Sequence, residues 1–199
     1  MRWTSLMQDL GSPAPQFSLP DGSGRLFQNR DFDASRGLMV AFICNHCPFV
    51  LHILDEFVSV ASDFRARGLA TVAISSNDID AHPEDGPLLM VRLAADRKFG
   101  FPYLYDADQS VAKAFGAVCT PDFFLYDGQR KLYYRGQLDS SRPATPHTEG
   151  KVGAGAKPTG ADMRAAIDGL LSGRPPPAGQ KPSMGCSMKW QPGNDPDGD

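Results

Sequence analysis

Two cysteines separated by two residues offer the clearest chemistry in this chain, in the motif Cys44-Asn45-His46-Cys47-Pro48. When the intervening residues wind into a first helical turn, the two sulfurs come close enough to form a disulfide and to open it again. The free N–H groups of such a turn stabilise a thiolate and lower its pKa. We therefore predict that Cys44 is the nucleophile and Cys47 the resolving thiol, and that a protonated His46 lowers the pKa of the nucleophile further.

Three other roles for the cysteine pair compete with redox chemistry. A zinc site needs two further ligands, but only His52 is nearby, with no second C-x-x-C and no histidine pair at ligand spacing. Haem attachment requires a histidine directly after the second cysteine, where this chain has Pro48. An inert buried pair is disfavoured, because the junction of a strand with a helix faces solvent at the carboxyl edge of a sheet. We expect no metal and no cofactor.

The motif lies between a predicted strand and a predicted helix. Residues 38–43 form a continuous apolar run, which predicts a strand buried on both faces. From Pro48, apolar residues recur at three- and four-residue spacing until Gly68, which predicts an amphipathic helix. Residues 69–75 predict a second buried strand, and a strand–helix–strand unit of this kind implies parallel pairing.

Shorter elements complete an α/β pattern whose sheet ends in an antiparallel hairpin. They are a hairpin over 17–27, a helix over 88–99, a strand over 103–105, a short helix from 108 to 115, strands over 123–126 and 131–135, and a helix over 160–171. The prolines at 175–177 cannot continue a helix. We therefore divide the chain into a domain over 1–173 and an irregular Pro/Gly-rich tail over 174–199.

Composition places the chain among ordinary globular proteins. It has 199 residues, of which 41% are hydrophobic and 22% charged, enough to bury one core. The net charge of −3 is too small to indicate a nucleic-acid partner or an anionic membrane surface. No apolar stretch reaches the length of a membrane span or a signal peptide, and four cysteines are sparse for a secreted disulfide framework. We therefore expect a cytoplasmic location.

A second motif, Cys119-Thr120-Pro121, precedes the predicted final hairpin. This motif opens the stretch CTPDFFLYD, and the cysteine pair belongs to the stretch FICNHCP. These two stretches and the order of elements over 13–173 resemble the thioredoxin superfamily, in its peroxiredoxin-like redoxin branch of AhpC/TSA type. The resemblance implies an α/β thioredoxin-like sandwich, in which helices flank a central mixed β-sheet, with an N-terminal β-hairpin and an irregular C-terminal tail.

The same resemblance implies roles for the second motif. Thr120-Pro121 is expected to be a cis-proline loop that lies against the active cysteines and whose backbone binds an extended substrate strand. Cys119 is then close to the cysteine pair, either as a substrate contact or third redox partner, or as a small buried hydrophobe.

Three functions remain open. The first, which we favour, is a thiol–disulfide oxidoreductase that acts on a protein or small-molecule disulfide and is served by an unidentified thiol reductant. The second is a thiol-dependent peroxidase with Cys47 as the reactive cysteine. In the related peroxidases a threonine occupies the place of Cys44 and an arginine lies near the place of Pro121, so here Arg135 or Arg142 would have to bind the peroxide. The third is a non-enzymatic module whose binding is switched by the redox state of the pair.

Proton transfer at the predicted site lacks an obvious base. Thioredoxins bury a carboxylate in the strand before the motif, but residues 38–43 are all apolar. The base is therefore expected to be His46 or water.

The tail contains the fourth cysteine, Cys186. Its surroundings over 182–190 resemble a bacterial peroxiredoxin-like subgroup. Cys186 could resolve an oxidised cysteine from a mobile tail, but we favour an ordered arm held in place by Met184 and Trp190.

Overall fold

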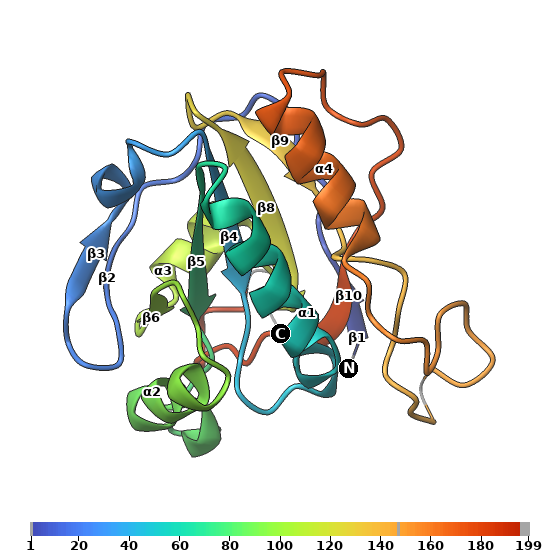
Figure 1. The fold of residues 1–199 in the computed structure, drawn as a ribbon. Coiled ribbons are helices and arrows are strands. Elements are labelled where there is room, and N and C mark those ends of the chain that lie inside the picture. Colours follow the sequence, from blue (N-terminus) through green and yellow to red (C-terminus); the bar gives the residue numbers. More distant parts are fainter. Residues whose placement is uncertain (1, 147, 196–199) are drawn as a thin grey trace.

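A five-stranded sheet forms the centre of the molecule, in a computed structural model that describes residues 2–146 and 148–195. Its strands are β4 (Gly37–Phe42), β5 (Leu69–Ser75), β6 (Tyr103–Tyr105), β8 (Asp122–Asp127) and β9 (Leu132–Arg135). They lie in the order β6-β5-β4-β8-β9 (Figure 1). β4 pairs in parallel with β5 and antiparallel with β8, so the sheet is mixed, as predicted.

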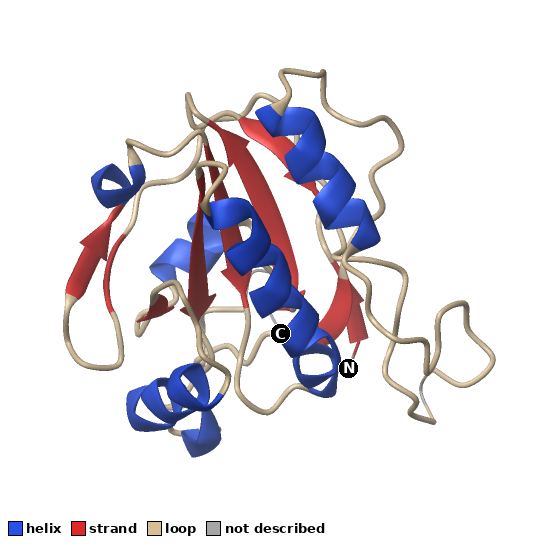
Figure 2. Cartoon of the chain, viewed as in Figure 1, coloured by secondary structure: helices blue, strands red, loops and turns tan. Residues whose placement is uncertain are grey.

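Helices cover both faces of this sheet. The helices are α1 (Pro48–Arg65), α2 (Pro87–Asp96), α3 (Ser110–Phe115) and α4 (Ala161–Leu171). Figure 2 shows α1 and α4 in front of the sheet and α3 behind it. α2 packs near the edge strand β6 and ends at Asp96, slightly before the predicted end.

The central strand β4 is apolar throughout because successive side chains enter two different cores. Met39 and Ala41 belong to the core under α1 and α4, whereas Val40 and Phe42 belong to the core that contains Phe115 of α3. All six residues of β4 are buried. The junction between β4 and α1 therefore lies between the two hydrophobic cores.

The N-terminal hairpin is confirmed. β2 (Ser18–Pro20) pairs antiparallel with β3 (Leu26–Gln28), and a short 3₁₀ helix, η1 (Asn29–Phe32), follows. An isolated bridge joins Asp21 to Leu104 of β6. The hairpin thus lies beyond the edge of the central sheet and on the side away from β9 (Figure 1).

We had predicted an irregular tail from its proline content, but part of the tail forms a strand. β10 (Met184–Ser187) forms the middle strand of a second small sheet, between β1 (Arg2–Thr4) and β7 (Cys119–Thr120). The sequence pattern missed this strand because both of its partners are distant in the chain. Met184 and Trp190 pack against the two cores, which confirms the ordered arm. The division of the chain at residue 173 stays a prediction.

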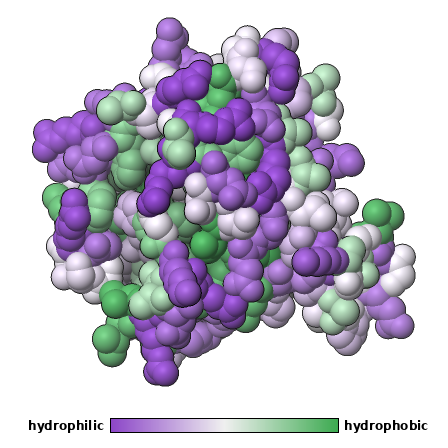
Figure 3. Space-filling model, in the orientation of Figure 1, coloured by the Kyte–Doolittle hydropathy of each residue, from purple (hydrophilic) through white to green (hydrophobic). Residues whose placement is uncertain are grey.

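The visible surface is largely hydrophilic, with apolar side chains scattered between polar ones (Figure 3). In the described part of the chain, no helix is long and apolar enough to cross a membrane.

Candidate active site

The cysteine pair lies where β4 leads into α1. Cys47 is the residue before the first turn of α1, in an extended conformation, and Pro48 occupies the first helical position, where its missing N–H costs nothing. Both cysteines are free thiols in the structure. Their exposed fractions are 1% for Cys44 and 0% for Cys47, so the expectation of a solvent-facing pair is wrong.

Thr120 contacts both sulfurs. The Sγ of Cys44 lies 3.4 Å from Thr120 Oγ1, and the Sγ of Cys47 donates a hydrogen bond of 3.1 Å to the Thr120 carbonyl oxygen. The Thr120–Pro121 peptide bond is cis. The predicted cis-proline loop therefore lies against the cysteine pair, although 73 positions separate Cys47 from Thr120.

We predicted a lowered pKa for Cys44, but it is the pKa of Cys47 that is lowered, while the pKa of Cys44 is raised. Hydrogen bonds from the thiols of Cys186 and Cys44 lower the pKa of Cys47 to about 2, against the effect of burial. The pKa of Cys44 is raised by its hydrogen bond with Cys47, by burial and by the negative charge of Asp85. The directions of the two pKa shifts favour Cys47 over Cys44 as the thiolate of the pair. When Cys47 carries a proton it donates to Thr120, and when it has lost the proton it accepts from its neighbours.

A buried carboxylate that the sequence analysis missed stands beside the motif. Asp85 is fully buried and accepts hydrogen bonds from the Asn45 backbone N–H and from Asn77 Nδ2, each of 2.7 Å. Its other close contact is His46 Nδ1, 2.8 Å from Asp85 Oδ2. The sequence analysis assigned this acid no role at the cysteine pair. The available signal was an acid in an irregular segment between two prolines.

His46 therefore faces a carboxylate as well as a sulfur. A nitrogen of His46, a carboxylate oxygen of Asp85 and the Cys44 Sγ lie within 4.8 Å of one another. The His46 ring stacks on the ring of His82, with centroids 5.0 Å apart. The carboxylate of Asp85 therefore stands beside the imidazole that we expect to act on the sulfurs.

The loop between the cysteines is tied to neighbouring segments through Asn45. Its Oδ1 accepts a hydrogen bond of 3.1 Å from the Tyr103 hydroxyl, and its Nδ2 donates one of 2.8 Å to the Glu84 carbonyl oxygen. Burial raises the pKa of Tyr103, so this hydroxyl remains a donor. These contacts hold the loop against β6 and η2 (Pro83–Asp85).

Two overlapping sets of side chains have the composition of metal ligands. One comprises Cys44, His46 and Asp85, and the other comprises His46, His82 and Glu84. Thiolate and imidazole together suit zinc or copper. His52, which the zinc alternative required, belongs to neither set within the described residues.

Cys119 is close to the pair but enclosed. Its exposed fraction is 0%, and its Sγ donates to the Pro121 carbonyl oxygen at 3.7 Å. Burial and the negative charge of Asp122 raise its pKa. These observations favour the small buried hydrophobe among the alternatives we considered.

The two arginines that could have served a peroxidase are engaged elsewhere. Arg135 is fully buried, forms an ion pair with Asp122, and lies over the Phe124 ring at 3.7 Å. Arg142 donates to Gln137 Oε1 and to the carbonyl oxygen of Asp139. No contact joins either guanidinium to a cysteine sulfur within the described residues.

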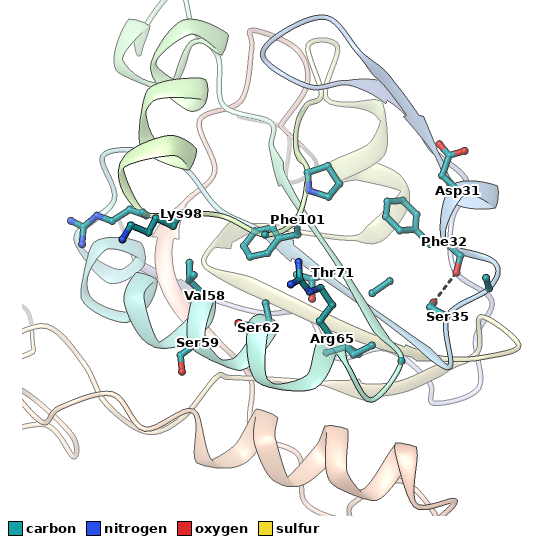
Figure 4. Close-up of a pocket in the computed structure, with 18 of the residues that line it drawn as sticks. Asp31, Phe32, Ser35, Val58, Ser59, Ser62, Arg65, Thr71, Lys98 and Phe101 are labelled. Carbon is teal, nitrogen blue, oxygen red and sulfur yellow. Dashed lines mark hydrogen bonds between the residues drawn. The ribbon is translucent and has the colours of Figure 1, made fainter.

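A large hollow of about 950 Å³ lies away from the cysteines. Figure 4 shows Val58, Ser62 and Arg65 of α1 on one side of it and Phe32 and Ser35 on another. No residue of either cysteine motif lines it.

The fold, with two thiols beside a cis-proline at the start of a helix, defines a thioredoxin-like protein. The model of the AhpC/TSA family matches residues 10–135, and the chain belongs to that redoxin family.

Solved structures agree with this assignment. A hypothetical protein from Sinorhizobium meliloti is 47% identical with a TM-score of 0.89, and the match covers 96% of this chain and 99% of that one. An uncharacterized conserved protein from Geobacillus kaustophilus is 46% identical with a TM-score of 0.89, over 96% and 97% of the two chains. The peroxidoxin BcpB from Mycobacterium tuberculosis, 19% identical with a TM-score of 0.58 over 84% and 99%, shares the fold. Comparison with curated proteins gives no match.

Proposed function

We propose that this protein is a thiol–disulfide oxidoreductase whose redox couple is Cys44 and Cys47. The observation that carries the proposal is the environment of Cys47: its sulfur lies 3.1 Å from the Thr120 carbonyl oxygen beside the cis-proline, the neighbouring thiols of Cys186 and Cys44 lower its pKa, and Cys44 stands at the C-x-x-C spacing of a reversible disulfide. Its substrates are protein or small-molecule disulfides, and a thiol reductant regenerates the dithiol. The reducing conditions of a cytoplasm suit this cycle.

In the proposed reaction Cys47 attacks first. Its thiolate attacks a substrate disulfide, a mixed disulfide forms, and one substrate thiolate leaves. Cys44 then gives up its proton and attacks the Cys47 sulfur, which releases the second substrate thiolate and leaves the Cys44–Cys47 disulfide. His46, with a nitrogen within 4.8 Å of the Cys44 sulfur, accepts the Cys44 proton through one bridging water, and Asp85 holds the imidazole in place.

Turnover of a small disulfide with dithiothreitol as reductant tests this function. The wild type should reduce many equivalents per chain, and Cys47→Ser should lose activity by about 10³-fold or more, because the attacking sulfur is gone. Cys44→Ser should accumulate the mixed disulfide on Cys47 when Cys186 is also replaced by serine, and mass spectrometry would detect the added substrate half. Oxidation of the pair without turnover would instead support the redox-switched binding module.

Peroxidase activity is the second candidate, and the lowered pKa of Cys47 favours it. The engaged arginines count against rapid peroxide reduction. Comparing kcat/KM for hydrogen peroxide and for a small disulfide, with the same reductant, separates the two activities. A peroxide value that exceeds the disulfide value by tenfold or more, about 1.4 kcal/mol of transition-state stabilisation, would overturn our preference.

A further inference from the structure

The tail strand β10 brings a third thiol to the reactive sulfur. Cys186 pairs with Thr120 in the small sheet, and Thr120 is the residue that contacts both sulfurs of the pair. Cys186 and Met184 pack against the same core as Cys44 and Cys47. Figure 1 shows β10 beside the first turn of α1. The Cys47 sulfur therefore has one thiol from its own loop and another from the far end of the chain.

We propose that Cys186 is a third redox-active thiol, which forms a disulfide with Cys47 and carries the oxidation from the buried couple to the surface. This inference rests on the proposed function, since it supplies the route by which a reductant reaches the couple. Cys186 is also a catalytic residue in this scheme, because it contacts the reacting sulfur.

The position of β10 is held on both sides of Cys186. Before it, Ser183 exchanges hydrogen bonds of 3.0 Å with Ser5, and Gly185 fits so closely that an added Cβ would lie 2.0 Å from the Thr120 carbonyl oxygen. After it, the Met188 N–H donates to the Val118 carbonyl oxygen at 3.0 Å, and the Lys189 N–H donates to Asn77 Oδ1 at 2.9 Å. These contacts hold the Cys186 thiol at a defined position within a sheet.

Exposure distinguishes Cys186 from the other three cysteines. Cys44, Cys47 and Cys119 are buried, whereas Cys186 is partly exposed. A reductant can attack a disulfide at the partly exposed Cys186, whereas attack on the Cys44–Cys47 bond, like the attack of Cys47 on a substrate, first requires the buried sulfurs to be uncovered. The hydrogen bond with Cys47 and burial raise the pKa of Cys186, and the positive charge of Lys189 opposes these effects only in part.

The exchange balances without a further reagent. Cys47, already in a mixed disulfide with half of the substrate, is attacked at its sulfur by the Cys186 thiolate. The Cys47–Cys186 bond forms, the Cys47–substrate bond breaks, and the substrate leaves as a thiolate, which takes up the proton that Cys186 released when it became a thiolate. Cys44 can make the same attack on Cys47, so the two internal disulfides interconvert with no change in the number of electrons.

Disulfide mapping tests the proposal. Trypsin leaves Cys44 and Cys47 together in the peptide 37–65 and Cys186 in the peptide 165–189, because Arg174 and Lys181 precede prolines. The reduced protein is treated with one equivalent of hydroxyethyl disulfide. Acid then stops the exchange, the remaining free thiols are alkylated, and the protein is digested. In Cys44→Ser we expect a cross-link between the two peptides in most of the oxidised protein. In Cys186→Ser we expect only a bond within peptide 37–65.

The matched control moves the thiol to the opposite face of the same strand. The double variant Cys186→Ser/Ser187→Cys keeps the composition of β10, but its thiol faces away from Cys47, so the cross-link to peptide 37–65 should disappear. If Cys44→Ser gives no cross-link, or if the double variant still gives it, the proposal is overturned. Circular dichroism of each variant checks that it has folded.

Kinetics separate this proposal from the proposed function. Cys186→Ser should lower turnover at least about tenfold more with a thioredoxin as reductant than with dithiothreitol, because dithiothreitol is small enough to reach the couple, so that its rate reports only the effect of losing the Cys186 donor to Cys47. An equal change, or no change, with the two reductants overturns the relay and leaves the oxidoreductase intact. A cross-link in a protein without any turnover would support the Cys47–Cys186 bond and overturn the oxidoreductase.

Discussion

At the scale of single residues, Cys47 is distinguished from Cys44 by its neighbours and not by its place in the motif. Hydrogen bonding from Cys186 and Cys44 lowers the pKa of Cys47, whereas hydrogen bonding to Cys47, burial and the negative charge of Asp85 raise the pKa of Cys44. A thiol that receives two donors is stabilised as a thiolate, and a buried thiol beside a carboxylate is stabilised as the neutral form. The attacking sulfur is thereby selected by contacts with other parts of the chain.

The acidity of Cys47 has a direct consequence for titration. Because its pKa is lowered, the thiolate persists as the pH falls from about 8 to about 5, where an ordinary thiol of pKa about 8.5 is protonated. The ultraviolet absorbance of the thiolate in the reduced protein should remain through this range. Cys47→Ser should lack it, since Cys44 and Cys186 have raised pKa values. A wild-type signal that disappears near pH 8 would contradict the assignment.

His46 is predicted to assist the second step, in which Cys44 loses its proton. His46→Gln should slow the release of product from the mixed disulfide about 10²-fold, with little change in the first attack. Rapid-quench measurement of the mixed disulfide would show its accumulation. The control is His52→Gln, a histidine further along α1 that belongs to neither candidate ligand set. Equal accumulation in the two variants would remove His46 from the mechanism.

At the scale of elements, the site is assembled from four segments: the end of β4, the first turn of α1, β7 with its cis-proline, and β10. The strand–helix unit and the final hairpin were predictable, because their apolar periodicity is local and each element contains its own pattern. β10 was not predictable in this way. A four-residue strand with a glycine has little propensity of its own, and it forms because β1 and β7 supply hydrogen-bond partners on both sides.

Gly185 tests how closely β10 must approach β7. In Gly185→Ala the added methyl group would meet the Thr120 carbonyl oxygen, so the strand must shift. We expect a loss of about 1–3 kcal/mol in the free energy of unfolding and a weaker Cys47–Cys186 cross-link. Urea denaturation and disulfide mapping measure the two effects. Gly100→Ala is the matched control, since its nearest neighbour is the flexible Arg65 side chain at 3.4 Å, and it should cost less than 1 kcal/mol by the same measurement.

At the scale of the whole molecule, a buried ion pair connects the hairpin to the N-terminal segment. Arg135 of β9 bonds to both carboxylate oxygens of Asp122 and donates to the carbonyl oxygens of Leu6 and Gly116. Ser5 also donates to Asp122, and Ser183 of the tail bonds to Ser5. The polar network thus runs from the final hairpin to the tail that carries Cys186.

Breaking this pair should destabilise the whole fold. Arg135→Met leaves Asp122 as a buried carboxyl group without its cation, and we expect a loss of about 3–5 kcal/mol in the free energy of unfolding. Arg67→Met removes the exposed pair with Asp168 and should cost at most about 1 kcal/mol. Urea unfolding of both variants measures the difference. Similar losses in the two would show that the buried network contributes no more than a surface pair.

The sequence by itself determined the fold class, the cysteine pair at the start of a helix and, through its resemblance to a family, the neighbouring cis-proline. These features depend on patterns within short stretches of chain. Only the tertiary structure decided that Asp85 stands beside His46, that Cys186 lies next to Thr120, which contacts both sulfurs, and that the pKa of Cys47 is lowered while that of Cys44 is raised. The physical reason is that pKa values and burial are set by contacts between residues far apart in the chain, and no local pattern records those contacts.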